Sequence, residues 1–168
     1  MLRRAHPSHP PSPGIPVLLL ACALPLVASG CGEPSPEAQE ADREGIQDFL
    51  EDYLPALAEA YRTGDVDILD PYAAEKEQAS IARRVDDLGE RGEVLAPELV
   101  SVQVEDVTSW AEVNAYVTTV EVWNIRTYAT GSENVVREEL GQTNRVKYQL
   151  QRDARRWRVF WREIQETY

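Results

Sequence analysis

The chain has 168 residues, of which 27% are charged, and a formal net charge of −12 at neutral pH. This length is enough for one domain with its own hydrophobic core. An acidic surface repels nucleic-acid phosphates and anionic lipid headgroups, so the composition predicts no nucleic-acid partner and no electrostatic attachment to a membrane.

The first 30 residues have the pattern of a bacterial export signal. Two arginines precede an apolar run that begins near Ile15 and ends in small residues directly before Cys31. This pattern indicates a signal peptide, and a cysteine at the cleavage point is typical of a lipoprotein. The run is interrupted by Pro16 and Pro25 and is too short for a membrane-spanning helix, which needs roughly 20 apolar residues. We predict a signal peptide over residues 1–30 and palmitate or related acyl chains on Cys31; the alternatives are an ordinary secretory signal or an uncleaved membrane anchor.

Cleavage before Cys31 would leave a chain without histidine, because His6 and His9 both lie in the signal segment. Cys31 would then be the only cysteine, and the lipid would occupy its sulfur, so no disulfide could form within the chain. These absences exclude Cys–His and Ser–His catalysis and zinc bound by histidine. The sequence therefore predicts no metal site and no cofactor.

The predicted mature chain begins with a tether and continues into a helix. Residues 31–41 are small and acidic and contain prolines, which is typical of a solvated tether, and we expect a single domain over residues 42–168. Apolar residues spaced by three or four then predict a helix; they are Ile46, Phe49, Leu50, Tyr53, Leu54, Leu57 and Tyr61. Pro55 interrupts this stripe without shifting its phase, which predicts either a kinked helix or two abutting helices.

A second helix is predicted from Asp70–Pro71, since aspartate is a good N-cap and proline fits the first helical turn. From residue 99 onward the apolar period becomes two, which predicts four strands joined by short connections. Ala115 and Val117 alternate in one phase, whereas Val120 and Val122 alternate in the other. We therefore expect a bulge near Thr118–Thr119 that restores the inward face of a bent sheet. The predicted fold class is α+β, with N-terminal helices packed on a strongly bent four-stranded antiparallel meander.

This order of elements resembles a known family. The residues that carry the likeness are Val102–Glu105, Ala111–Ala115, Tyr148–Asp153 and Arg156–Val159, with Trp157 opening the last strand. Over roughly residues 42–165 the pattern resembles the cone-shaped fold of the nuclear-transport-factor-two-like (NTF2-like) superfamily, and within it the IMS domain of plastid-division and cyanobacterial proteins. The resemblance implies a cone-like α+β fold. It leaves function open, because the superfamily contains ketosteroid isomerases and polyketide cyclases as well as binding modules.

None of the positions that we expect to face inward carries a side chain suited to proton transfer. Enzymes of the superfamily place a proton-handling side chain inside the cone, and a carboxylate in that role needs an apolar pocket. The positions that we expect to face inward are apolar, or carry the uncharged Gln142 and Asn144. The sequence therefore predicts no catalytic residue.

The candidate ligand-binding or partner-binding residues are aromatic and basic side chains of the last three strands: Trp123, Tyr148, Arg158, Trp161 and Arg162. The aromatic residues would either line a pocket at the open end of the cone or form core. The arginines of the last hairpin would either bind an acidic peptide or protein segment, or form a solvated strand face.

Together these observations predict a lipid-anchored cell-envelope binding or accessory protein without catalytic activity. The acyl chains on Cys31 would attach it to the outer membrane in a bacterium with two membranes, and to the outer face of the plasma membrane in a bacterium with one. A small carboxylate-dependent isomerase or dehydratase of the ketosteroid-isomerase or polyketide-cyclase type is the alternative, and a structural subunit of an envelope complex is a third reading.

Overall fold

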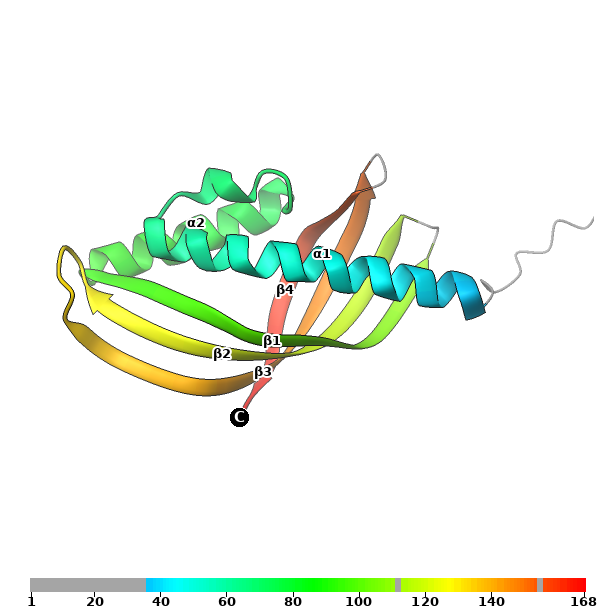
Figure 1. Ribbon diagram of the computed structural model, residues 1–168. Helices are drawn as coiled ribbons and strands as arrows, with labels where there is room; N and C mark the ends of the chain where they lie inside the picture. Colours follow the sequence, from blue (N-terminus) through cyan, green and yellow to red (C-terminus); the bar gives the residue numbers. More distant parts are fainter. Residues whose placement is uncertain (1–35, 111–112, 154–155) are drawn as a thin grey trace, which may run out of the picture. The chain divides into compact units, whose positions relative to one another are not determined.

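The computed structural model describes residues 36–110, 113–153 and 156–168. The predicted signal peptide and Cys31 lie outside these residues. The elements, shown in Figure 1, are α1 (Pro36–Thr63), the short 3-10 helix η1 (Val66–Leu69), α2 (Glu75–Glu90), β1 (Glu93–Trp110), β2 (Asn114–Ala129), β3 (Val135–Asp153) and β4 (Arg156–Thr167). The strands form one antiparallel sheet in the order β1-β2-β3-β4, so the predicted α+β meander with N-terminal helices is confirmed.

Helix α1 packs its apolar stripe against the inner face of the bent sheet (Figure 1). The buried members of the stripe are Ile46, Leu50, Tyr53, Leu54, Leu57 and Tyr61. Pro55 lies on the exposed side of this one continuous helix, so the predicted alternative of two abutting helices is wrong. The helix begins at Pro36, inside the stretch that the composition suggested as a tether. Of the helices in residues 36–168, none combines the length and the apolar character that a membrane crossing requires.

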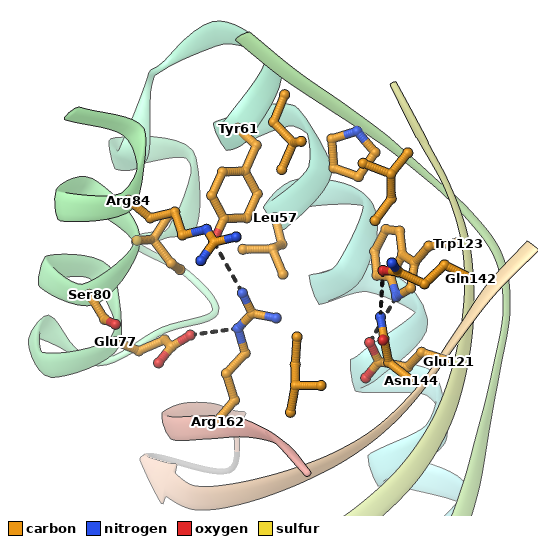
Figure 2. A pocket seen from close by; sticks show the side chains of 15 residues that line it. Leu57, Tyr61, Glu77, Ser80, Arg84, Glu121, Trp123, Gln142, Asn144 and Arg162 are labelled. Carbon is orange, nitrogen blue, oxygen red and sulfur yellow. Dashed lines mark hydrogen bonds and ion pairs between the residues drawn. The ribbon is translucent and has the colours of Figure 1, made fainter. Parts of the chain in front are cut away.

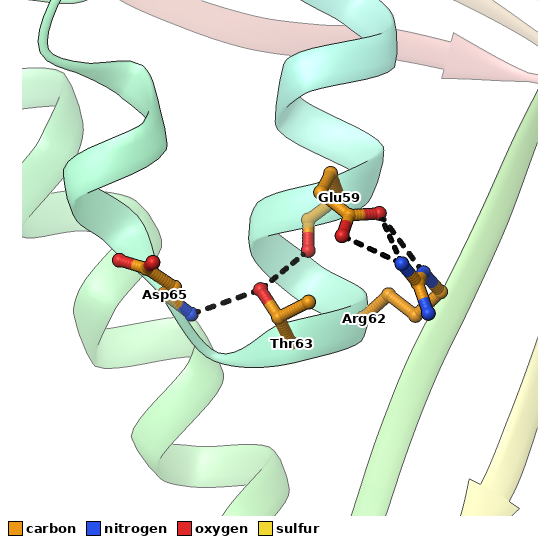
Figure 3. Close-up of polar contacts among 4 residues, drawn as sticks. All are labelled: Glu59, Arg62, Thr63 and Asp65. Atoms are coloured by element: carbon orange, nitrogen blue, oxygen red, sulfur yellow. Dashed lines mark hydrogen bonds and ion pairs between the residues drawn. The ribbon is translucent and has the colours of Figure 1, made fainter.

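The end of α1 is fixed by Thr63 and Gly64 (Figure 3). The Thr63 hydroxyl donates to the Glu59 carbonyl at 2.8 Å and accepts from the Asp65 amide at 3.2 Å. Gly64 has a φ of 76°, in the left-handed region, and its amide donates to the Ala60 carbonyl at 2.9 Å. A glycine in this conformation is a common helix terminator because it has no Cβ to clash.

The predicted start of the second helix at Asp70 is wrong, because α2 starts at Glu75 after its N-cap Ala74. Residues near Asp70 are held by other partners instead. The Ala74 amide donates to the Val159 carbonyl at 2.8 Å, so this connection pairs with β4 before the helix begins. Tertiary pairing thus delays the helix that the local signal favoured.

Strand β2 keeps one phase over its buried length, and the bulge predicted near Thr118–Thr119 is wrong. The buried side chains of β2 are Ala115, Val117, Thr119, Glu121, Trp123 and Thr127. A register shift does lie opposite Thr118 and Thr119, but on the neighbouring strand β1, between Val104 and Asp106. Because side chains alternate along a strand, Val120 and Val122 lie on the other face of the sheet. Two polar side chains, Thr119 and Glu121, therefore occupy inward positions that the prediction gave to valines.

Candidate functional site

A pocket of about 360 Å³ lies between α1, α2 and the sheet (Figure 2). This volume is in the range of sites that bind small molecules. Its apolar and aromatic lining comprises Leu57, Tyr61, Ile81, Leu95, Pro97, Trp123, Ile125 and Ile164. Its polar lining comprises Glu77, Ser80, Arg84, Glu121, Gln142, Asn144 and Arg162. The pocket thus offers both apolar surface and several charged groups.

One wall contains an ion pair between α2 and β4. Arg162 Nε donates to Glu77 Oε1 at 2.9 Å, and Arg162 Nη2 donates to the Tyr61 hydroxyl at 3.2 Å. The Glu77 side chain is only 4% exposed and that of Arg162 is 18% exposed. A carboxylate buried to this degree needs a charged partner, and Arg162 supplies it. The pair therefore holds the last strand against α2.

The opposite wall contains a second buried carboxylate, that of Glu121, which is 1% exposed. Glu121 Oε1 accepts from the Tyr148 hydroxyl at 2.5 Å and from the Thr119 hydroxyl at 2.9 Å, and Oε2 accepts from Trp123 Nε1 at 2.9 Å. A carboxylate has about four acceptor positions, so three of them are occupied by side chains of this chain. Figure 2 shows Glu121 and Trp123 across the pocket from Glu77 and Arg162.

Each of these carboxylates has a buried tyrosine as a neighbour, Tyr53 at Glu77 and Tyr148 at Glu121. Burial raises the pKa of Tyr148 well above its usual value, and the negative charge of Glu121 raises it further. Burial likewise raises the pKa of Tyr53, although the positive charge of Arg162 opposes the shift. Both phenols are therefore neutral hydrogen-bond donors at physiological pH.

The structure brings part of the predicted binding set together. Trp123 and Arg162 line the pocket. Tyr148 is fully buried and contacts the site through Glu121. Arg158 donates through Nη2 to the carbonyls of Asp70 at 3.0 Å and Ala73 at 2.5 Å, which fastens β4 to the connection before α2.

Trp161 is half-buried and is not part of the pocket lining. In the β3–β4 ladder it lies opposite Gln149. Of the five predicted residues, Trp123 and Arg162 thus line the pocket. Tyr148 contacts a lining residue, and Arg158 and Trp161 lie elsewhere.

Sequence reasoning missed Glu77, Glu121, Ser80 and Arg84. The spacing of three of these was available, because Glu77, Ser80 and Arg84 are three and four residues apart on α2 and so share a helix face with Ile81. Glu121 was missed because the apolar neighbours Val120 and Val122 suggested the opposite phase for β2. The residues that the structure describes contain no group of three or more His, Cys, Asp or Glu side chains placed to hold a metal ion.

Helices packed on a bent, open antiparallel sheet, with a pocket between the two layers, define an α+β domain of the NTF2-like class. The particular family follows from the sequence of residues 42–157, which matches the family of the TcaA protein NTF2-like domain. The chain belongs to this family. The predicted NTF2-like resemblance is confirmed.

The solved structures that are similar to this chain share little sequence with it. The intermembrane space region of the chloroplast protein ARC6 is 14% identical, with a TM-score of 0.62, over 73% of this chain and 95% of that one. This match supports the predicted IMS-domain pattern at the level of the fold. Aln2 from a Streptomyces species is 14% identical, with a TM-score of 0.44, over 79% of this chain and 93% of that one. An uncharacterized protein with a cystatin-like fold from Caulobacter vibrioides is 12% identical, with a TM-score of 0.42, over 71% and 87% of the two chains. No protein of curated function matches the sequence.

Proposed function

We propose that this chain is a lipid-anchored accessory protein of the bacterial cell envelope, and that its NTF2-like domain binds a ligand or partner through the pocket without transforming it. The observation that carries the proposal is the way in which both pocket carboxylates are used. Glu77 is engaged by Arg162, and Glu121 accepts three hydrogen bonds from its own chain. Carboxylates with these partners form part of the pocket wall, whereas a general base needs an unoccupied acceptor position directed at the substrate.

The envelope setting is supported by the sequence and by the names of similar proteins. The N-terminal pattern that ends at Cys31 favours export and acylation. The domain family is named after the TcaA protein, and the ARC6 region with the same fold lies in an intermembrane space. Acyl chains would supply the attachment, because an acidic domain gains nothing from anionic headgroups.

The anchor is tested by metabolic labelling of the full chain with a palmitate analogue. We expect labelling and membrane fractionation of the native chain, and loss of both in Cys31→Ser. Labelling that persists in Cys31→Ser would contradict this account of attachment.

The pocket is tested by photo-crosslinking in cells. A crosslinking amino acid at Ser80, which lines the pocket, is compared with the same amino acid at Arg83, an exposed residue of α2 outside the lining. We expect a discrete adduct from position 80 and none of the same mass from position 83. Identical adducts, or none at position 80, would refute the pocket as the binding site.

One observation favours a second candidate function, that of a proton-transfer isomerase or dehydratase. Glu121 retains one acceptor position beside the pocket, and it is hydrogen-bonded to Tyr148. Such a site would use Glu121 as the base. Glu121→Gln would then abolish turnover of an enolisable ketone, whereas on the binding proposal native protein and variant are equally inactive.

A further inference from the structure

The pocket lining contains an arginine that forms no ion pair within the described part of the chain. Arg84 is exposed on α2 and lines the pocket. No ion pair joins it to an acidic side chain among residues 36–110, 113–153 and 156–168, whereas Arg162 is paired with Glu77. Arg84 follows the buried Ile81 by three residues on α2, so the two side chains share a helix face and both line the pocket.

Other hydrogen-bond donors line the pocket together with Arg84. Figure 2 shows Ser80 and Tyr61 among the labelled side chains of the lining. The Tyr61 hydroxyl, which accepts from Arg162, keeps its own hydrogen for donation.

The rest of the pocket determines what kind of anion fits. The wall away from the arginines is formed by Leu95, Pro97, Ile125 and Trp123. The carboxylates Glu77 and Glu121 also face the pocket, and they disfavour a ligand of high negative charge. Glu77 and Arg162 pair with each other, and Glu121 accepts three hydrogen bonds from its own chain. Arg84 is therefore the charged group of the lining that has no partner among the described residues, and a single guanidinium suits a monoanion. A guanidinium fork matches a carboxylate in a bidentate geometry.

We propose that the pocket binds a small apolar carboxylic acid, with its carboxylate at Arg84 and its apolar body against Leu95, Ile125 and Trp123. This inference rests on the proposed binding function and specifies its ligand class. The volume of about 360 Å³ limits the ligand to the size of a small molecule.

The test uses the full-length protein labelled with nitrogen-15 and three soluble probes of one shape: 4-phenylbutanoate, 4-phenylbutan-1-ol and 4-phenylbutylamine. The indole N–H of Trp123 donates to Glu121 in the pocket wall, so its NMR signal reports occupancy locally. We expect a saturable shift with the acid, and at least tenfold weaker binding of the alcohol and the amine, because a hydrogen bond to a charged group contributes at least that much.

Arg84→Met removes the charge and keeps the length of the side chain. We expect it to weaken binding of 4-phenylbutanoate at least tenfold, and Arg84→Lys to weaken it less. Arg83→Met is the matched control, because the hydrogen bond that Arg83 makes within the described residues goes to the Ala79 carbonyl of its own helix. The dissociation constant of 4-phenylbutanoate for Arg83→Met should stay within twofold of the native value. Arg84 is exposed, so these variants should fold, as circular dichroism will verify.

Three results would overturn the inference: equal binding of the three probes, tightest binding of the amine, or unchanged binding in Arg84→Met. A chain that binds none of the probes would overturn it as well. In each case the crosslinking experiment at position 80 tests the proposed binding function independently: an adduct there would support binding in the pocket even if the ligand is not a carboxylic acid.

Discussion

Removal of Arg162 should destabilise the domain strongly, because it leaves the Glu77 carboxylate buried without a counterion. In Arg162→Met the remaining hydrogen-bond donor to Glu77 is the Tyr53 hydroxyl, at 3.5 Å. Breaking a buried ion pair from one side costs about 3–5 kcal/mol. Because Arg162 is 18% exposed and borders the pocket, water can replace part of its charge, so we expect about 3 kcal/mol. With a urea m-value of about 2 kcal/mol/M, the unfolding midpoint should fall by roughly 1.5 M.

The control is the surface pair Arg62–Glu59 of α1, drawn in Figure 3, whose side chains are 58% and 40% exposed. Arg62→Met should leave the urea midpoint close to that of the native chain, because an exposed ion pair contributes little to stability. The double variant Glu77→Gln, Arg162→Met should regain about 1–2 kcal/mol over Arg162→Met alone, because the unpaired charge is gone. A loss below about 1 kcal/mol in Arg162→Met, or no recovery in the double variant, would refute the reasoning.

Three further predictions concern the core and the turn after α1. Tyr148→Phe removes a donor to the buried Glu121 and should cost about 1.5–3 kcal/mol in urea unfolding, whereas Tyr116→Phe, at an exposed site, should cost less than about 0.5 kcal/mol; equal losses would contradict the assignment. Gly64→Ala should lower the free energy of unfolding by about 1 kcal/mol, because the φ of Gly64 is 76°. Gly45→Ala, in open space on α1, should raise it by up to about 1 kcal/mol. Melting temperatures that change in the same direction in both variants would contradict these backbone arguments. Burial raises the pKa of Tyr53 and Tyr148 above that of the unfolded chain, so their contribution to the free energy of unfolding is complete below about pH 10 and is lost as the pH rises through the folded-state pKa values. Urea midpoints measured from pH 8 to 11 should therefore fall less steeply in Tyr148→Phe than in the native chain. The same slope in both would contradict this pH prediction.

The fold was largely predictable because its main signals are local and repeated. The stripe of α1 and the alternation of the strands each extend over several turns or residue pairs, so a single exception such as Pro55 does not hide them. The start of α2 was not predictable from Asp70–Pro71, because pairing of the following residues with β4 opposes the local capping signal.

The site was harder to predict, since it depends on polar residues in inward positions. Hydrophobic alternation assigns Val120 and Val122 to the core, yet Thr119 and Glu121 are buried there with their hydrogen bonds satisfied within the core. A polar core network is visible only once the donors from other strands, such as Tyr148, are known. Trp123 and Arg162 could be named as candidates because aromatic and basic residues near the open end of a cone are plausible ligand contacts whichever phase β2 adopts. Both line the pocket, and their role in binding stays a prediction.

The pocket joins parts of the chain that are made at very different times. Glu77 and Arg162 are 85 positions apart, and the second belongs to the last strand. A nascent polypeptide that has left the ribosome only as far as β3 has α2 and Trp123 but cannot assemble this cavity. A ligand in the pocket would therefore stabilise only the fully synthesised domain. Ligand binding would follow folding of the last strand and would not guide the folding of the earlier elements.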